Sequence, residues 1–163
     1  ENYVDNDSLF GQDVHDAFDS AIIDILESGN CLAVECHTAA VFHLMRVSEH
    51  GLRALAERLT VTVSHNRQPM PITEATWDEI ITQINNKIIS TRTLAKGNPL
   101  RQLQLALYSE ATIVCAGMKD LYRNDVSHAR RPYTRSQAFA VMETVRNFMK
   151  FLAKALALDA GTF

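Results

Sequence analysis

The amino-acid sequence predicts an all-α fold: an antiparallel bundle of about five helices that forms a single domain over residues 1–163. Apolar residues recur every three or four positions along most of the chain, which is the spacing of one helix face. No segment shows the strict alternation of a half-buried strand. The 47% hydrophobic and 21% charged content supplies enough apolar material for one sizeable core.

The first helix is predicted from Asp13, a suitable N-cap, to the pair Gly29-Asn30, which is typical of a helix end. Residues 1–12 are expected to form a loosely ordered N-terminal segment. The apolar face of this first helix consists of Val14, Ala17, Phe18, Ala21, Ile22, Ile25 and Leu26.

A longer second helix is predicted over residues 31–59, with a bend near residues 48–51. Residues 60–72 then break the helical spacing, because Pro69 and Pro71 prevent regular helix there. We expect an exposed connection or a short extended segment in this region. The apolar face of the second helix consists of Val41, Leu44, Met45, Ser48, Leu52, Leu55 and Leu59.

The third and fourth helices flank a turn predicted at residues 96–99. The third helix is expected to begin at about Thr73 or Thr76, and Thr76 forms a capping-box pattern with Glu79. Its expected buried residues are Trp77, Ile80, Ile81, Ile84 and Ile88. The fourth helix is expected to end at Tyr122. Its expected buried residues are Leu100, Leu103, Leu107, Ala111, Val114, Met118 and Leu121.

The fifth helix begins at Thr134, which forms a second capping-box pattern with Gln137. Its expected buried residues are Ala138, Val141, Met142, Val145, Phe148, Leu152 and Ala155. Because each helix carries one apolar stripe, all five can bury their stripes around a single core. A stripe left exposed would indicate a dimer.

The three cysteines, Cys31, Cys36 and Cys115, are odd in number and include no Cys-x-x-Cys pair. We therefore expect buried free thiols and neither a disulfide framework nor a zinc site. No apolar stretch approaches the roughly 20 residues of a spanning helix. The acidic first thirty residues are unlike a signal peptide. These features predict a cytoplasmic protein with no membrane contact.

Charge is segregated along the chain, although the net charge is only -3. Residues 1–45 contain nine acids and no Lys or Arg, whereas residues 119–154 contain eight bases and three acids. The basic C-terminal part is able to attract a polyanion such as nucleic acid. An acidic helix packed against a basic one would explain the segregation equally well.

The main indication of function lies between the last two predicted helices, where Arg123 and Asn124 precede His128. A guanidinium is always charged and its fixed donors suit a phosphate group. An imidazole can accept or donate a proton near neutral pH. RNA carries its own nucleophile, the adjacent 2′-hydroxyl, so cleavage to a 2′,3′-cyclic phosphate requires no metal. If the helix extends beyond Tyr122, these three side chains can converge.

A structural interpretation of the same residues is also open. Arg123 can pair with a carboxylate such as Asp120, and Asn124 can cap the helix. His128 can bond to a backbone carbonyl. Spacing alone does not decide between catalysis and these structural roles.

Arg123, Asn124 and His128 resemble the Arg-x4-His signature of the HEPN superfamily, in which Asn often follows the Arg. Over almost the whole chain, the sequence resembles a bacterial group within that superfamily. The residues that carry this wider resemblance are Cys31, Leu32, Ala33, residues 38–46, Glu49, Trp77, Lys119, Tyr133, Phe148, Met149, Leu152 and Ala153.

The resemblance implies a helical bundle that dimerises and brings two Arg/His loops toward a shared cleft. Many HEPN proteins are metal-independent endoribonucleases of toxin-antitoxin, abortive-infection or antiviral systems, so the resemblance implies RNA and an antitoxin or regulatory protein as partners, and no cofactor. Arg123 would hold the scissile phosphate, Asn124 would position it, and His128 would act as acid or base. Other members have lost catalysis and serve as binding or scaffold modules.

One HEPN toxin subgroup, regulated by nucleotidyl transfer, places Tyr two residues after the His. Here that position is Arg130, so we do not expect this form of regulation. The basic residues Arg130, Arg131 and Arg135 add phosphate-binding charge beside His128. The predicted substrate-binding residues are Tyr122, Arg130, Arg131, Tyr133 and Arg135, the two tyrosines either contacting a nucleobase or fixing the loop.

A second polar stripe follows the second predicted helix, with Glu49 beside it. The stripe consists of His43, Arg46, His50, Arg53 and Glu57. Arg46, Glu49 and His50 are candidates for a second layer of the site, in which Arg46 or Glu49 orients the Arg123 loop. The alternative is a solvated face with intrahelical ion pairs. We predict no metal site, because His43 and His50 are two turns apart, about 10 Å of helix rise.

Overall fold

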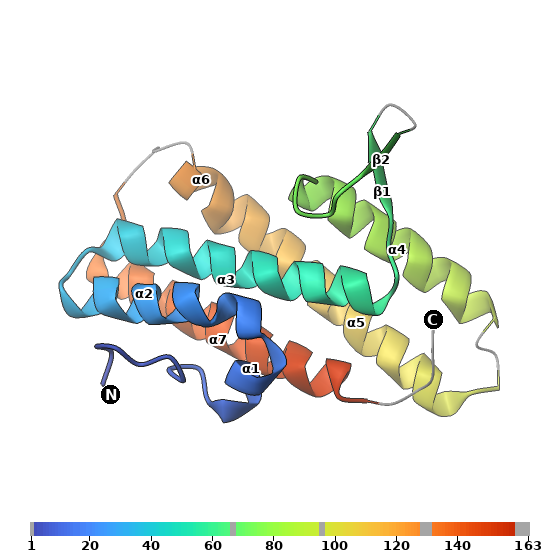
Figure 1. The fold of residues 1–163 in the computed structure, drawn as a ribbon, viewed down its shortest axis with the longest axis horizontal. Helices are drawn as coiled ribbons and strands as arrows, with labels where there is room; N and C mark the ends of the chain where they lie inside the picture. The colour runs from blue at the N-terminus through green and yellow to red at the C-terminus, as the bar shows by residue number, and fades with distance from the viewer. Residues whose placement is uncertain (1, 66–67, 95–96, 128–131, 159–163) are drawn as a thin grey trace.

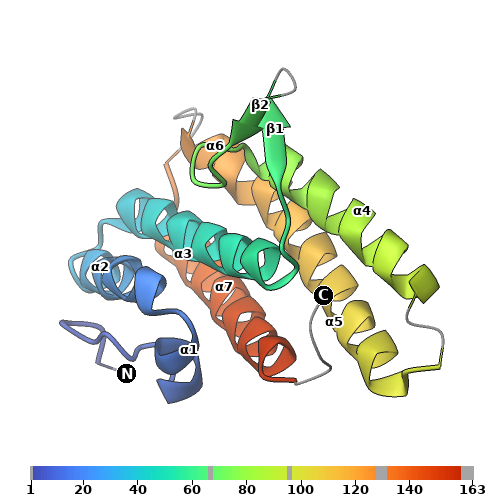
Figure 2. The ribbon, with the colours of Figure 1, turned by 45° about the vertical axis from the view of Figure 1, so that its right-hand side comes forward.

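The computed structural model describes residues 2–65, 68–94, 97–127 and 132–158, and these residues form a helical bundle (Figures 1 and 2). The predicted all-α fold is confirmed. The five long helices are α2 (Ile22–Ala33), α3 (His37–Arg58), α4 (Trp77–Leu94), α5 (Pro99–Met118) and α7 (Arg135–Leu156).

Helix α3 lies at the centre of the bundle and packs against both α2 and α7. Helices α4 and α5 pack against each other on the other side, and α3 and α7 both contact α5 (Figure 2). One continuous core joins these layers. Its largest fully buried side chains are Trp77, Tyr108, Phe10, Ile25, Leu44, Leu52, Leu55, Leu59, Ile80, Ile84, Leu105 and Met142.

The first predicted helix is broken into three pieces, so the prediction of one continuous helix was wrong. Helix α1 (Gln12–Ala17) is followed by a 3₁₀ turn, η1 (Asp19–Ala21), and only then by α2. The break falls at Phe18, whose backbone leaves the helical region at φ -135° and ψ 63°. The Phe18 side chain is buried in the core, and this burial is a favourable contribution at the break.

The predicted helix end at Gly29-Asn30 was also wrong, because α2 continues to Ala33. Gly29 serves close packing here: a Cβ at this position would lie 2.5 Å from the carbonyl oxygen of Tyr3. The N-terminal segment therefore packs directly on α2. Leu9 and Phe10 of this segment are 5% and 1% exposed and belong to the core.

Helix α3 is a separate helix of 22 residues with no break at residues 48–51. The residue that separates it from α2 is Glu35, which has φ 62°. Gly51 marks the place where α7 approaches α3, because a Cβ there would lie 2.8 Å from the sulfur of Met149. Gly51 therefore permits the close packing of α3 on α7.

Residues 60–72 contain short extended segments, one of the two expected alternatives, and these pair as a small antiparallel hairpin. Strands β1 (Val63–His65) and β2 (Gln68–Met70) pair with Val63 opposite Met70. Pro69 lies in β2 and pairs with Ser64 of β1. A proline is tolerated there because a two-stranded sheet has only edge strands.

Both predicted capping boxes are confirmed. The Thr76 amide donates to Oε2 of Glu79 at 2.8 Å, and the Glu79 amide donates to the Thr76 hydroxyl at 3.3 Å. Thr134 and Gln137 form the equivalent reciprocal pair at the start of α7. These local hydrogen bonds satisfy amides that the first helical turn leaves without intrahelical partners.

The predicted buried face of α5 was wrong. Of the seven residues expected inside, only Ala111 and Met118 are buried, and Leu107 is partly buried. The buried residues of α5 are Gln104, Leu105, Tyr108, Ala111, Thr112, Cys115 and Met118. The core face therefore includes the polar side chains of Gln104 and Thr112. The Thr112 hydroxyl is satisfied by the Tyr108 carbonyl at 2.7 Å.

The three cysteines are free, but they are not all buried. Cys115 is buried, Cys31 is partly buried and Cys36 is exposed next to the start of α3. The expectation of a buried thiol at Cys36 was therefore wrong. Burial raises the pKa of the Cys115 thiol. Among the described residues, no helix has the length and apolar character needed to cross a membrane.

Candidate functional site

The helix that leads to the Arg123 motif was predicted to end at Tyr122, but it extends beyond this residue. It continues through a π-helical turn, η2 (Lys119–Arg123), into the short helix α6 (Asn124–Ser127) (Figure 1). The Asn124 amide donates to the carbonyl of Lys119, five residues earlier, which defines the π turn. Such turns insert a residue into a helix and occur frequently at functional sites.

The first turn of α4 holds this π turn at both ends. The Lys119 ammonium contacts the Asp78 carboxylate and lies 3.1 Å from Oδ1 of Asp120. Hydrogen bonds to these two carboxylates raise the pKa of Lys119. At the other end, Cζ of Arg123 lies 5.4 Å from the ring centroid of the buried Trp77. This cation–π contact positions the Arg123 guanidinium against α4.

Arg123 lines a small pocket together with residues of α3 and α6. The pocket, here called the Arg123 pocket, has a volume of about 210 Å³ and is lined by Phe42, Met45, Arg46, Glu49, Arg123 and Val126. It is smaller than the roughly 300–1,000 Å³ typical of drug-sized ligand sites. Its size suits one part of a larger ligand that extends across the surface.

The charges of the Arg123 pocket favour an anion. Two of its six lining residues are arginines, and the one carboxylate, Glu49, already accepts from Nη2 of Arg53. The Asp120 carboxylate that the sequence offered as a partner for Arg123 contacts Lys119 instead. Within the described part of the chain, Arg123 forms no ion pair with a carboxylate.

The other predicted catalytic residues are only partly covered by the structure. Asn124 opens α6 directly after Arg123 and is half-buried. His128 lies outside the described residues, as do Arg130 and Arg131. The sequence-based expectation that Arg123, Asn124 and His128 converge therefore remains a prediction.

The two predicted tyrosines lie close to each other and fix the segment before α7. The Tyr133 hydroxyl donates to the Tyr122 carbonyl at 3.5 Å, and the Tyr133 amide donates to the Thr38 hydroxyl at 3.0 Å. Tyr133 is 7% exposed, so its position favours the loop-fixing role over stacking on a base. Arg135 is exposed, with Nη1 4.0 Å from a carboxylate oxygen of Glu35.

The sequence interpretation missed the central residue of the polar stripe on α3. Asp24 of α2 is 4% exposed and accepts hydrogen bonds from three side chains of that stripe. Oδ1 lies 2.7 Å from Nε of Arg46 and 2.9 Å from Nδ1 of His43, and Oδ2 lies 3.3 Å from Nε2 of His50. These three residues thus pair between helices, whereas Glu49 and Arg53 form the intrahelical ion pair that the alternative interpretation expected.

Asp24 carries a stabilised negative charge. Burial by itself raises the pKa of Asp24, but the hydrogen bonds from Arg46 and His43 outweigh it, so the pKa lies below the usual value. The same contact with Asp24 raises the pKa of Arg46. The sequence did indicate that Asp24 is buried, because Asp24 lies three residues after Ala21 and four before Ser28, the spacing of one helix face.

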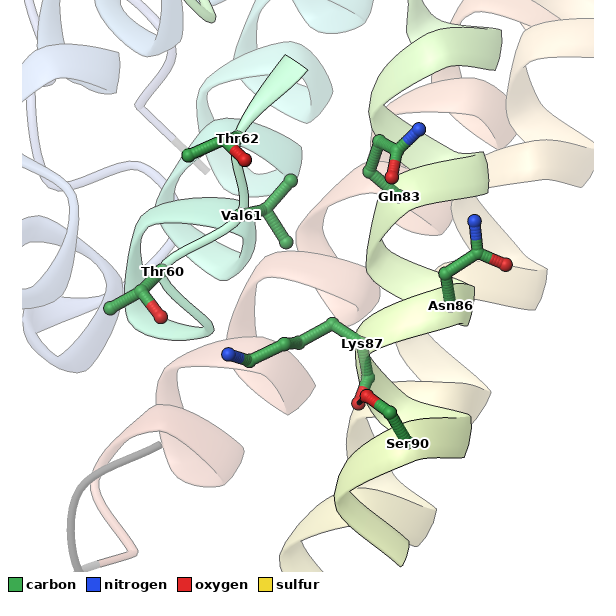
Figure 3. A pocket seen from close by; sticks show the side chains of 7 residues that line it. All are labelled: Thr60, Val61, Thr62, Gln83, Asn86, Lys87 and Ser90. Atoms are coloured by element: carbon green, nitrogen blue, oxygen red, sulfur yellow. Dashed lines mark hydrogen bonds between the residues drawn. The ribbon is translucent and has the colours of Figure 1, made fainter.

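A second pocket, of about 380 Å³, lies between the segment after α3 and helix α4 (Figure 3). In Figure 3 the Lys87 side chain reaches from α4 toward that segment. The lining residues are Thr60, Val61, Thr62, Gln83, Asn86, Lys87 and Ser90. None of them is a predicted site residue, and every one except Val61 is polar or charged. All are at least partly exposed, so this pocket is a shallow surface feature.

Several apolar residues of α5 that were predicted to be buried, or that lie beside them, are exposed in the structure. This α5 stripe consists of Leu103, Ala106, Glu110, Ile113, Val114 and Gly117, all exposed and spaced three or four residues apart or adjacent. Ile113 is 71% exposed and Leu103 is 52% exposed. A groove lined by Glu110, Val114, Thr144, Asn147, Phe148 and Phe151 continues the stripe toward α7.

Comparison of the chain with protein-family models, with curated proteins and with solved structures gives no match. The fold defines an all-α helical-bundle protein. Among the residues that the structure describes, no group of three or more His, Cys, Asp or Glu side chains is placed to hold a metal ion.

Proposed function

We propose that this protein is a metal-independent endoribonuclease of the HEPN type. The observation that carries the proposal is the Arg123 pocket, in which Arg123 and Arg46 face one cavity and Glu49, the carboxylate among its described lining residues, is paired with Arg53. A polyanion that enters such a pocket meets two permanently charged guanidinium groups. The motif residue Arg123 is thus free of carboxylate partners among the described residues and available to a phosphate.

In the proposed reaction the 2′-hydroxyl of the substrate attacks the adjacent phosphorus. His128 removes the hydroxyl proton while water protonates the leaving 5′-oxygen, or His128 protonates the 5′-oxygen while water accepts the hydroxyl proton. In either case Arg123 stabilises the charge that develops on the phosphoryl oxygens. Asn124 positions the phosphate. The P–O5′ bond breaks as the new P–O2′ bond forms, which gives a 2′,3′-cyclic phosphate and a 5′-hydroxyl.

The protein is proposed to act as a homodimer. Apart from Glu110, the α5 stripe supplies an apolar surface of the kind that an interface between copies would cover. Following the HEPN resemblance, the biological role would be that of a toxin or antiviral effector in the cytoplasm, restrained by an antitoxin or another regulatory protein.

The direct test is an RNA cleavage assay in EDTA with the full chain, followed by analysis of the product ends. Wild-type protein should release 2′,3′-cyclic phosphate ends, and Arg123→Ala and His128→Ala should each lower the rate by about 10²–10⁴. The matched controls are Arg92→Ala, an exposed arginine of α4, and His15→Ala, a histidine of α1. Both controls should cleave RNA at the wild-type rate.

Other outcomes separate the alternatives. Tight RNA binding without cleavage would identify a catalytically inactive RNA-binding module. Turnover of cyclic or dinucleotide substrates, but not of long RNA, would identify a small-nucleotide hydrolase. Cleavage that persists in both folded variants would contradict the proposed site.

A further inference from the structure

Arg46 occupies an unusual position, because one edge of its guanidinium is fixed in the protein and the rest faces outward. Its Nε donates to the buried carboxylate of Asp24 at 2.7 Å. The Arg46 side chain is nevertheless 53% exposed. Within the described residues, the two terminal nitrogens of Arg46 form no hydrogen bond, so their four N–H groups are available to a ligand.

The anchor that holds Arg46 is itself rigidly built. Asp24 lies on α2, and its two oxygens receive three donors from successive turns of α3. A buried carboxylate is stable only when such donors satisfy it, so the position of Asp24 is fixed by packing and hydrogen bonding together. Because its Nε donates to Asp24, the Arg46 guanidinium is held in a fixed position as well.

Arg46 also faces two neighbouring cavities. It lines the Arg123 pocket, and it lines a second cavity of about 80 Å³ with Glu49, His50 and Arg53. In this region the Glu49 carboxylate accepts from Arg53, and the Asp24 carboxylate is buried behind Arg46. The Arg46 side chain is 53% exposed, whereas those of His43, His50, Arg53 and Glu49 are 20–26% exposed, so Arg46 is the member of this polar cluster that is most accessible to an incoming anion.

We propose that Arg46 is an anion-binding residue of the Arg123 pocket, where it binds a phosphate of a single-stranded polynucleotide, and that Asp24 is its positioning residue. This inference rests on the proposed function and adds to it a second guanidinium with a defined support. A guanidinium that is already oriented loses little conformational freedom on binding, so more of its hydrogen-bond energy appears as affinity. His43 and His50 stabilise Asp24 in this arrangement.

The proposal is tested by the salt dependence of binding to a substrate that cannot react. The probe is a fluorescein-labelled 2′-O-methyl oligonucleotide, which lacks the attacking hydroxyl. For single strands, log K falls with log salt by about 0.7 for each phosphate that the protein neutralises. Arg46→Gln should reduce this slope by about 0.7 and weaken binding about tenfold at low salt. Arg46→Lys keeps the charge but loses the separate Nε contact with Asp24, so it should retain only part of the slope, and Arg92→Gln should leave both quantities unchanged.

The positioning role of Asp24 is tested by a double-mutant cycle with the same probe. In an Asp24→Asn background, Arg46→Gln should weaken binding only about twofold, because Arg46 is no longer held in place. Equal losses in both backgrounds would overturn the role of Asp24. Circular dichroism and urea unfolding verify that each variant is folded, and the Arg46→Gln and Arg46→Lys pair tests the anion site even if Asp24→Asn does not fold.

The outcomes distinguish this inference from the proposed nuclease. If Arg123→Gln lowers the salt slope and Arg46→Gln does not, the assignment of Arg46 is wrong and the nuclease proposal stands. If Arg46→Gln lowers the slope but wild-type protein does not cut RNA, the anion site stands and the nuclease proposal is wrong. Absence of any binding by the wild-type protein overturns the assignment of Arg46, and the nuclease proposal is then decided by the cleavage assay.

Discussion

Nε of Arg46 lies 2.7 Å from Oδ1 of Asp24, and this contact joins α2 to α3 through a carboxylate that is only 4% exposed. Replacing Asp24 by Ala removes the acceptor of three side-chain donors. We expect Asp24→Ala to lower the free energy of unfolding by about 2–4 kcal/mol, since hydrogen bonds to charged groups are among the stronger ones. Urea unfolding followed by circular dichroism measures the change.

The control for this prediction is Asp19→Ala, which removes an exposed carboxylate from the neighbouring turn η1. Its effect should stay within about 0.5 kcal/mol, as is usual for surface substitutions. Equal effects of the two substitutions would mean that the Asp24 contacts add nothing to stability.

The lowered pKa of Asp24 predicts how stability depends on pH. Arg46, His43 and His50 face this carboxylate, and the pKa of Asp24 is lower in the folded protein than in the unfolded chain, where it is about 3.9. Protonation therefore favours the unfolded state, and the contribution of Asp24 is fully present well above pH 4 and is lost as pH falls through the folded value.

The measurement compares the wild-type protein with Asp24→Asn, which has a similar shape and does not titrate. Their difference in free energy of unfolding should be largest near pH 6 and should shrink steadily from pH 4 to pH 3. A difference that stays constant or grows over this interval contradicts a lowered pKa at Asp24.

Two glycines in different environments give a matched pair of substitutions. A Cβ at Gly51 would lie 2.8 Å from the Met149 sulfur and 3.1 Å from Cε1 of Phe148, whereas a Cβ at Gly117 would meet nothing within 4 Å. Gly51→Ala should therefore destabilise the protein by about 1–3 kcal/mol through overpacking.

Gly117→Ala should instead stabilise the protein by about 0.5–1 kcal/mol, because alanine is the better helix former. Differential scanning calorimetry of both variants checks the opposite signs. A Gly51→Ala variant at least as stable as the wild type would show that the Met149 and Phe148 side chains can move away from this position without loss of stability.

The elements that the sequence predicted correctly are those that depend on local chemistry. Thr76 and Thr134 each make their capping bonds to a residue three positions away, so short patterns were sufficient to place the starts of α4 and α7. The buried isoleucines Ile80, Ile84 and Ile88 of α4 follow one unambiguous periodic stripe.

The buried face of α5 could not be chosen from periodicity, because both faces of this helix contain large apolar residues. Leu105 and Tyr108 are buried, while Leu103 and Ile113 are exposed. The buried Gln104 amide made the true core face look more polar than the exposed one. Only the neighbouring helices decide such a case.

Only the part of the candidate site that a short sequence pattern marks was predicted. Arg123 was found because its motif is contiguous, and Arg46 and Glu49 were named as candidates and line the same pocket. Asp24 was missed because its partners are 19 to 26 residues away, and pairing between helices leaves no short pattern in the sequence.

The exposed α5 stripe predicts that the protein associates with itself, and this association can be measured. We expect the protein to form a dimer through this surface, because exposed residues such as Ile113 and Leu103 lose contact with water when a second copy covers them. Ile113→Asp places a charge in that interface and should raise the dissociation constant at least about tenfold, or about 1.4 kcal/mol.

Ile23→Asp is the matched control, since Ile23 is 75% exposed on α2, outside the stripe. Sedimentation velocity over a range of micromolar concentrations measures both, and a wild-type protein that stays monomeric, or an equal effect of the two substitutions, would show that α5 does not form the interface.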